Sequence, residues 1–363
     1  MCQKRQLTKG AKKMNNNFNQ NGQFGGWANG YSYSAEMYNE QYLKFMQKEQ
    51  EKEKIRKISK RCFLAVIMYV LISYALSFAI VGISWVYPSI NKIYNETLPM
   101  LAFDILLSLS SIGVPFLILH LIQRKEKVAE ELPFGTTYNR EVAKNLIMVS
   151  LPLMILSAIA INFVSSLFQE IIGIEFTSSV SDMSLKGVRE TILGSFSVAV
   201  IPAIIEETVI RGIVMQPLRK YGDKFAIVAS ALLFAVMHGN MVQIPYTIIG
   251  GLLLGYLAVA TGSLWPSIIL HFINNMYSVV VLSVNDNISE GASAIVTGVM
   301  LICFTVCGII GVMNLIKMKY KMSWVNNNST LTVGEKVTAA LKNGPAIVSF
   351  ILLGLITLSN ISF

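Results

Sequence analysis

Long apolar runs alternate with short polar segments along the chain from residue 62 onward. A run of about 20 apolar residues can cross a ~30 Å hydrocarbon core as a helix. Runs of this kind lie at 62–86, 98–122, 144–168, 191–214, 243–261, 264–284, 292–316 and 343–361. A shorter run at 224–239 is bounded by Lys224 and by His238. No run alternates as the strands of a barrel do, so the pattern predicts an all-α polytopic transmembrane helix bundle of about eight or nine spans.

The composition agrees with this architecture. Hydrophobic residues make up 53% of the 363 residues and charged residues only 14%. A soluble domain usually carries about 25% charged residues. The chain is therefore predicted to be an integral membrane protein whose surroundings are the lipid bilayer.

The basic residues fall in alternate loops. Residues 44–61, 123–144, 219–224 and 317–321 are rich in Lys and Arg, whereas the loops between them carry few. The net charge is +9, but this distribution forms no face that could bind nucleic acid. By the positive-inside rule it predicts a cytoplasmic N-terminus and an external C-terminus. The Asn- and Gln-rich N-terminal arm favours a bacterial plasma membrane.

Four ionisable side chains interrupt the apolar runs: Glu206, Glu207, His238 and His271. Such groups cost several kcal/mol at membrane depth and are usually functional there. Glu207 and Arg211 are four residues apart on one helical face, so they are predicted to form a buried ion pair. Glu206 is rotated by ~100° from that pair and is left to face a cavity.

Helix geometry predicts that the other polar residues reach the same depth. Glu206 and His238 lie on two helices joined by a short basic loop, which makes these helices antiparallel neighbours. Each side chain lies ~20 Å from the cytoplasmic end of its helix, so the two can meet. His271 and Asn275, four residues apart, project from one face of a later span. The sequence therefore predicts a polar site inside the bilayer that uses water as a reactant.

Three spaced motifs carry a family resemblance: Glu206-Glu207-x-x-x-Arg211, Phe234-x-x-x-His238 and His271-x-x-x-Asn275. In this order they resemble the motifs of the CPBP family, which comprises CAAX prenyl endopeptidases, bacteriocin-processing proteins and Abi self-immunity proteins. The resemblance covers about residues 190–282. It implies an intramembrane endopeptidase acting on a membrane-associated peptide or protein that enters from the membrane or the cytoplasmic side. Bacteriocin-type maturation, self-immunity and CAAX-like processing are the activities that the resemblance leaves open.

The family's chemistry allows a metal-free scheme. In this scheme Glu206 and His238 activate a water, and His271 and Asn275 donate hydrogen bonds to the oxyanion. Structural support is assigned to the remaining motif residues, Glu207, Arg211 and Phe234.

A zinc scheme is the other route. Glu206, His238 and His271 are then the metal ligands, and a fourth position is left to water. The metal-free scheme is favoured because Arg211 already claims one carboxylate. Zinc as cofactor and no cofactor at all both stay open at this stage.

Two other function classes are compatible with intramembrane Glu and His residues. A proton-coupled membrane transporter could use them as a relay, but the polar groups cluster in one part of the chain and no inverted repeat is evident. A non-catalytic immunity protein on the same fold is the second alternative, and the intact motifs argue against it.

The chain is predicted to consist of five parts. They are a disordered polar arm (1–34), a basic juxtamembrane helix (35–61), N-terminal transmembrane helices (62–189), a catalytic CPBP-like transmembrane core (190–284), and C-terminal transmembrane helices (285–363) with a cytoplasmic linker at 318–342.

Overall fold

The computed structural model of the protein describes residues 35–89, 96–128, 131–173, 175–176, 183–322, 324 and 329–362. The polar arm predicted to be disordered, 1–34, lies outside these residues. The chain forms two compact units, Met1–Gln47 and Lys48–Phe363. All of the predicted spans belong to the second unit.

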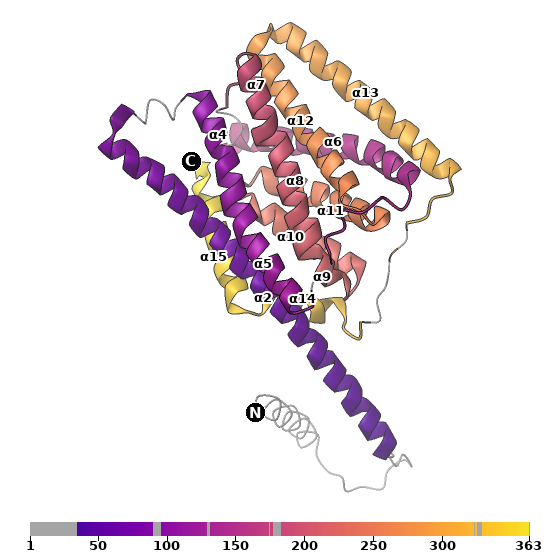
Figure 1. Cartoon of the computed structure of the whole chain (residues 1–363). Coiled ribbons are helices and arrows are strands. Elements are labelled where there is room, and N and C mark those ends of the chain that lie inside the picture. Colours follow the sequence, from indigo (N-terminus) through magenta and orange to yellow (C-terminus); the bar gives the residue numbers. More distant parts are fainter. Residues whose placement is uncertain are drawn as a thin grey trace. The chain divides into compact units, whose positions relative to one another are not determined.

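Helices dominate the second unit (Figure 1). The helix α2 (Ala35–Val86) begins in the first unit and joins the predicted juxtamembrane helix to the first predicted span without a break. The helices that follow are α4 (Thr97–Leu107), η1 (Ser108–Gly113), α5 (Val114–Lys125), α6 (Arg140–Ile172), α7 (Val188–Gly194), η2 (Ser195–Val200), α8 (Ile201–Glu207), η3 (Thr208–Val214), α9 (Met215–Arg219), α10 (Asp223–Met237), α11 (Gln243–Thr261), α12 (Trp265–Asn287), α13 (Glu290–Lys317), α14 (Val333–Leu341) and α15 (Gly344–Ser359). Two short strands, β1 (Glu175–Phe176) and β2 (Ile361–Ser362), pair antiparallel. The prediction of an all-α helix bundle is confirmed.

The number of spans is lower than predicted. Among the described residues, six helices are long and apolar enough to cross a membrane, or seven if the pair α14 and α15, bent by 79°, is one span. The predicted span at 191–214 is divided into short pieces, α7 to α9, by its π-helical segments. The predicted span at 224–239 is α10, which has only 15 residues. These helices make the chain an integral membrane protein. The predicted number of eight or nine spans is only roughly supported.

The helix that carries Glu206 and Glu207 changes its winding on both sides of them. The π-helical segments η2 and η3 flank the short α8. Pro202 has no N–H, so the carbonyl of Val198 lacks its α-helical donor four residues on. Asn275 of α12 donates to this carbonyl instead, at 3.0 Å. Single π-helical turns are rare and are frequently found at functional sites.

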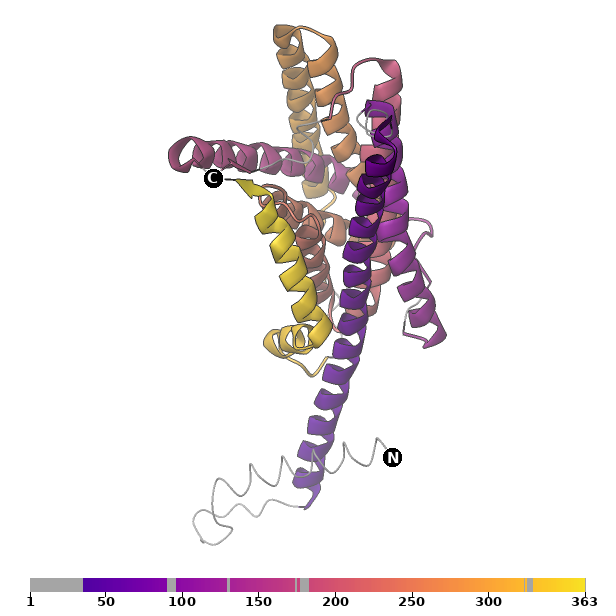
Figure 2. The same cartoon turned by 90° about the vertical axis from the view of Figure 1, so that its left-hand side faces the viewer.

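The helices around α8 and η3 approach one another closely. A Cβ atom at Gly251 of α11 would lie 3.0 Å from the Cα atom of Ala231 in α10, so only glycine permits this packing. The helix α6 packs against α11 and α13. Figure 2 shows α6 running across the direction of α13. The helix α10 packs against α11 and contacts η3, so it lies beside the helix that bears the two glutamates.

The predicted linker at 318–342 contains the helix α14, which is tied to α2. The helix begins with a capping box, in which the Thr332 hydroxyl accepts from the Glu335 N–H and the Glu335 carboxylate accepts from the Thr332 N–H. Glu335 also lies 3.3 Å from the ammonium of Lys52 on α2. The helix α15 then packs along α2, where the Ser349 hydroxyl donates to the carbonyl of Phe63 at 3.0 Å.

The attachment of α14 to α2 through Glu335 is expected to weaken at acidic pH. The Thr332 backbone N–H, with Lys52 and Lys48, holds the pKa of Glu335 down at about 2. A carboxyl whose pKa is lower in the folded state stabilises the fold above its unfolded pKa, and this stabilisation is lost as the pH falls toward the folded pKa. We therefore expect Glu335→Gln to melt below wild type at about pH 6, and the difference to disappear near pH 2–3. A control at the exposed Glu170, Glu170→Gln, is expected to melt with wild type throughout; a pH-independent gap for Glu335→Gln would contradict the assignment.

Candidate active site

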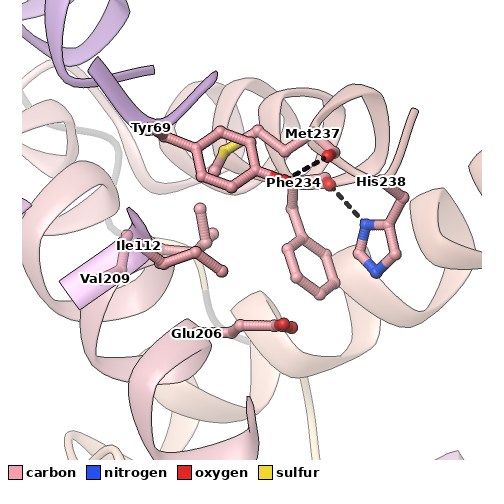
Figure 3. A pocket seen from close by; sticks show the side chains of 8 residues that line it. Tyr69, Ile112, Glu206, Val209, Phe234, Met237 and His238 are labelled. Atoms are coloured by element: carbon pink, nitrogen blue, oxygen red, sulfur yellow. Dashed lines mark hydrogen bonds between the residues drawn. The ribbon is translucent and has the colours of Figure 1, made fainter. Parts of the chain in front are cut away.

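A cavity of about 190 Å³ lies where α2, η1, α8, η3 and α10 meet. The described residues that line it are Tyr69, Ile112, Glu206, Val209, Ile210, Phe234, Met237 and His238 (Figure 3). Most of this wall is apolar, and its polar groups are the Glu206 carboxylate, the His238 imidazole and the Tyr69 hydroxyl. The Glu206 side chain is 20% exposed. The two residues predicted to activate water therefore share one cavity among packed helices.

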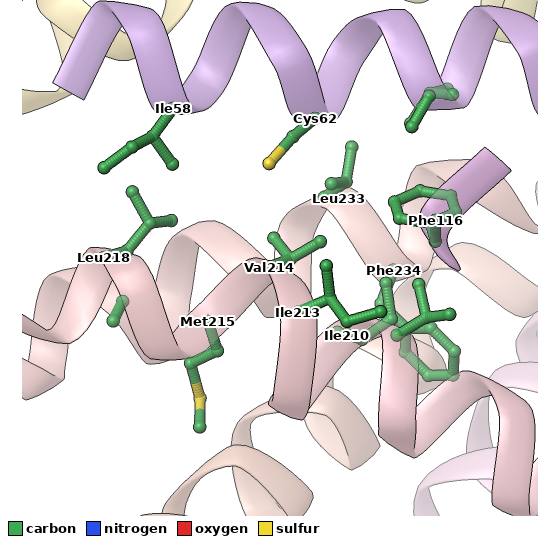
Figure 4. Close-up of a cluster of buried hydrophobic side chains, with 14 of the residues drawn as sticks. Ile58, Cys62, Phe116, Ile210, Ile213, Val214, Met215, Leu218, Leu233 and Phe234 are labelled. Atoms are coloured by element: carbon green, nitrogen blue, oxygen red, sulfur yellow. The ribbon is translucent and has the colours of Figure 1, made fainter. Parts of the chain in front are cut away.

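The cavity rests on an apolar cluster that joins its helices. Side chains of α2, α5, η3 and α10 interdigitate there, among them Cys62, Phe116, Ile210, Val214 and Leu233 (Figure 4). Each of these side chains is at most 7% exposed. A packed cluster of this kind holds its helices in one arrangement, so the walls that α2, η3 and α10 give to the cavity are fixed relative to one another.

Glu207 and Arg211 form the predicted ion pair. The Arg211 Nη1 atom lies 2.7 Å from the Glu207 Oε1 atom, and both side chains are fully buried. Arg211 also donates through Nη2 to the carbonyl of Gly251 at 3.2 Å. The helical phase assigned this pair correctly, and it left Glu206 turned to the cavity.

His271 belongs to the same buried network. Its Nδ1 atom lies 2.9 Å from the Glu207 Oε1 atom. This carboxylate oxygen therefore contacts both Arg211 and His271. Its Nε2 atom lies 3.8 Å from the Glu206 Oε2 atom, too far for a hydrogen bond. His271 thus stands between the two glutamates and is bonded to the structural one.

The orientation of His238 follows from the end of α10. Its Nδ1 atom lies 2.8 Å from the carbonyl oxygen of Phe234. A carbonyl oxygen can only accept, so Nδ1 carries the proton and the neutral ring keeps its lone pair on Nε2. His238 therefore offers a proton acceptor to the cavity that it shares with Glu206.

Phe234 connects the polar groups of the site. Its ring centroid is 4.7 Å from that of His238 and 6.0 Å from that of His271, in edge-to-face arrangements. The guanidinium carbon of Arg211 lies 4.6 Å from the same centroid. The predicted supporting role of Phe234 thus has a structural counterpart, since one ring contacts the ion pair and both imidazoles.

Asn275 is not among the described residues of the cavity wall. Its Nδ2 atom donates to the carbonyl of Val198, and its Oδ1 atom accepts from Asn274 at 3.2 Å. Neither His271 nor Asn275 is among the described residues that line the cavity. Their predicted role as donors to the oxyanion stays a prediction; the Asn275 amide is engaged with η2, and His271 has only its Nε2 atom left to offer.

The ligands of the zinc scheme are not gathered. In the part of the chain that the structure describes, no three His, Cys, Asp or Glu side chains are placed to hold a metal ion. His238 and His271 each have one ring nitrogen engaged, by a backbone carbonyl and by Glu207. As they lie, Glu206, His238 and His271 do not fit a three-ligand zinc site.

Two contacts at the site were not found from the sequence. Tyr69, in the middle of α2, reaches the cavity, and its hydroxyl lies 3.4 Å from the carbonyl oxygen of Met237. Asn360, after α15, donates to the carbonyl of Gly239 at 2.8 Å. Tyr69 lies inside an apolar run and Asn360 close to the end of one, and neither has a spaced polar partner in the sequence that would single it out.

The turn after His238 depends on glycine. Gly239 has φ +58°, and a Cβ atom there would lie 2.8 Å from the Cγ2 atom of Ile356 on α15. We expect Gly239→Ala to lower the free energy of unfolding by about 1–2 kcal/mol, because a left-handed conformation is strained for alanine. A thermal melt in detergent tests this, with Gly354→Ala as control, since a Cβ atom at Gly354 meets nothing within 4 Å. Equal melting of the two variants would count against this packing.

Comparison with protein families identifies the segment that contains the site. Residues 188–277 match the family model described as type II CAAX prenyl endopeptidase Rce1-like. The matched segment begins with α7, ends inside α12 and contains every motif residue from Glu206 to Asn275. The family resemblance predicted from the motifs is confirmed. No curated protein and no solved structure gives a significant match to the chain.

Proposed function

Residues 188–277 are Rce1-like, and we propose that the protein is an intramembrane endopeptidase of the CAAX-protease type that uses the cavity of Glu206 and His238 as its active site. The observation that supports the proposal is that both side chains line the same cavity. A carboxylate and an imidazole in one cavity are the groups that general-base hydrolysis requires. The apolar remainder of the wall suits a substrate that arrives from the lipid phase.

Glu206 and the His238 Nε2 atom are both hydrogen-bond acceptors, so one water can donate a hydrogen bond to each of them. The water oxygen attacks the carbonyl carbon of the scissile peptide, and one of the two groups accepts the water proton. The π pair of the carbonyl moves to its oxygen and forms the oxyanion. When this intermediate collapses, the C–N bond breaks and the protonated group returns its proton to the leaving nitrogen.

The other motif residues support this step. The ion pair of Glu207 and Arg211 fixes the helix that presents Glu206, and His271 is held by the same carboxylate. In the proposal His271 and Asn275 stabilise the oxyanion as the motif resemblance implies. For His271 this requires a proton on Nε2, since Nδ1 already bonds Glu207.

The substrate is proposed to be a membrane-associated peptide or protein. The candidates are a bacteriocin-type precursor, a self-immunity target and a CAAX-like protein, and the similarity to CAAX prenyl endopeptidases favours the last. The host membrane is proposed to be a bacterial plasma membrane, with a cytoplasmic N-terminus and an external C-terminus. The alternation of basic and neutral loops supports this orientation.

The proposal is tested with purified protein in liposomes. A panel of membrane peptides, including prenylated CAAX-like peptides and bacteriocin-type precursors, is incubated in ¹⁸O-labelled water and analysed by mass spectrometry. Hydrolysis is expected to place one ¹⁸O atom in the new carboxylate of a cleaved peptide. The variant His238→Ala is expected to leave the panel intact.

Two other outcomes would overturn the proposal. Intact peptides with wild-type protein, together with a proton flux across the liposome membrane that His238→Ala removes, would indicate a transporter. Equal cleavage by wild type and His238→Ala would mean that the cavity is not the active site.

A further inference from the structure

Tyr69 brings a hydroxyl group into the cavity from outside the family-matched segment. It lies in α2, whereas the match begins with α7. In Figure 3 its ring projects over the cavity that contains Glu206, and its hydroxyl is turned toward the end of α10. The helix α2 is held in this position by its apolar contacts with η3 and α10, which include Ile58, Cys62 and Val66.

The hydroxyl has only a weak partner. Its oxygen lies 3.4 Å from the carbonyl oxygen of Met237, whereas hydroxyl hydrogen bonds usually measure about 2.7–2.8 Å. Met237 is the last residue of α10, where helix carbonyls lack an intrahelical donor. The phenolic proton can turn about its C–O bond, so Tyr69 can exchange this neutral acceptor for a better one.

An oxyanion formed in the cavity is such an acceptor. Hydrogen bonds to a charged acceptor are roughly twice as strong as those between neutral groups. In the proposed mechanism the other described polar groups on the cavity wall, Glu206 and the His238 Nε2 atom, act as proton acceptors. The donors proposed from the motifs, His271 and Asn275, lie off this wall: the Asn275 amide is engaged by Val198, and His271 has only its Nε2 atom left beside its contact with Glu207. The Tyr69 hydroxyl is therefore the donor that the described cavity wall itself supplies.

We propose that Tyr69 is a further catalytic residue of the hydrolysis, and that its hydroxyl donates a hydrogen bond to the oxyanion of the tetrahedral intermediate. The inference rests on the proposed endopeptidase function. The Tyr69 proton stays on its oxygen throughout. The new C–O bond forms from a water lone pair, the carbonyl π pair becomes the oxyanion, and the same pair re-forms the C=O bond when the C–N bond breaks. The water proton passes through Glu206 or His238 to the leaving nitrogen. Tyr69 therefore stabilises the oxyanion without gaining or losing a proton.

Tyr69→Phe tests this role because it removes one oxygen atom and keeps the ring. The peptide of the liposome panel that wild type cleaves fastest serves as substrate, and a phosphinic analogue of its scissile bond serves as a mimic of the intermediate. We expect kcat to fall by about 10²–10³, as for other single oxyanion donors. We expect KM and the melting temperature to stay within about twofold and about 2 °C of wild type, and the analogue to bind more weakly in parallel with kcat.

Tyr74→Phe is the matched control, since Tyr74 is 44% exposed on the same helix and is not among the described residues that line the cavity. It is expected to cleave as wild type does. A Tyr69→Phe variant with wild-type kcat and wild-type affinity for the analogue would overturn the inference. The result for Glu206→Gln separates this failure from that of the proposed function. If Glu206→Gln is inactive and Tyr69→Phe is fully active, only the role of Tyr69 is wrong. If Glu206→Gln and His238→Ala are also both active, or if wild type cleaves no peptide, both proposals fall.

Discussion

Glu206→Gln is expected to lower the rate of peptide cleavage by a factor of about 10²–10⁴, the range that a lost general base causes. Glutamine has nearly the shape of glutamate, but its amide cannot accept a proton from water. The side chain lies at the cavity rather than in the buried ion pair. The loss is therefore expected in kcat, with little change in the melting temperature.

The measurement compares initial cleavage rates of wild type and variant in the same liposomes. Glu170→Gln is the matched control, because this glutamate is exposed on α6 and away from the cavity lining. It is expected to cleave at the wild-type rate. A Glu206→Gln variant with more than about a tenth of wild-type activity would show that another group accepts the proton, since a general base supplies at least 10²-fold. His238, the other acceptor at the cavity, would then be the first candidate.

Local helix geometry accounts for what the sequence could predict at the site. Glu207 and Arg211 lie on one helix, so their spacing alone decides that they meet, and Glu206 is directed away by the same spacing. The meeting of Glu206 and His238 also follows from local rules, because a short loop joins their helices. Both predictions depended on the helical rise and phase and on nothing distant.

Contacts between distant segments could not be predicted in this way. The bond of His271 to Glu207 joins residues 64 positions apart, and the spacing of His271 from Asn275 says nothing about it. Tyr69 resembles any aromatic residue of a membrane span until α2 is packed against α10. The same limit applies to Asn360 and Gly239, whose contact depends on the path of α15.

The backbone of the fourth predicted span shows a further limit. An apolar run predicts one straight helix, yet Pro202 frees the carbonyl of Val198 and a π-helical turn precedes it. Asn275 then satisfies this carbonyl from another helix. The motif spacing identified Asn275 as special, but only the packed structure shows which group it bonds.

Arg211→Ala is expected to destabilise the protein by about 3–5 kcal/mol, as when one partner of a buried ion pair is removed. The Glu207 carboxylate would keep only His271 as a partner and would remain fully buried. The Gly251 carbonyl and the Phe234 ring would lose the guanidinium as well. The measurement is denaturant unfolding in detergent micelles, followed by tryptophan fluorescence, with cleavage recorded on the protein that remains folded.

The double variant Glu207→Gln with Arg211→Met separates the missing charge from the missing volume. It removes both charges and keeps two long side chains, so no buried charge is left without a partner. We expect it to recover most of the stability that Arg211→Ala loses, because an apolar or neutral replacement of a buried pair is often close to neutral. If both variants unfold at the same denaturant concentration, the loss comes from packing rather than charge. If Arg211→Ala unfolds with wild type, the ion pair does not hold the helix that presents Glu206, and the fixed position of that carboxylate must come from the apolar cluster around Ile210 and Val214.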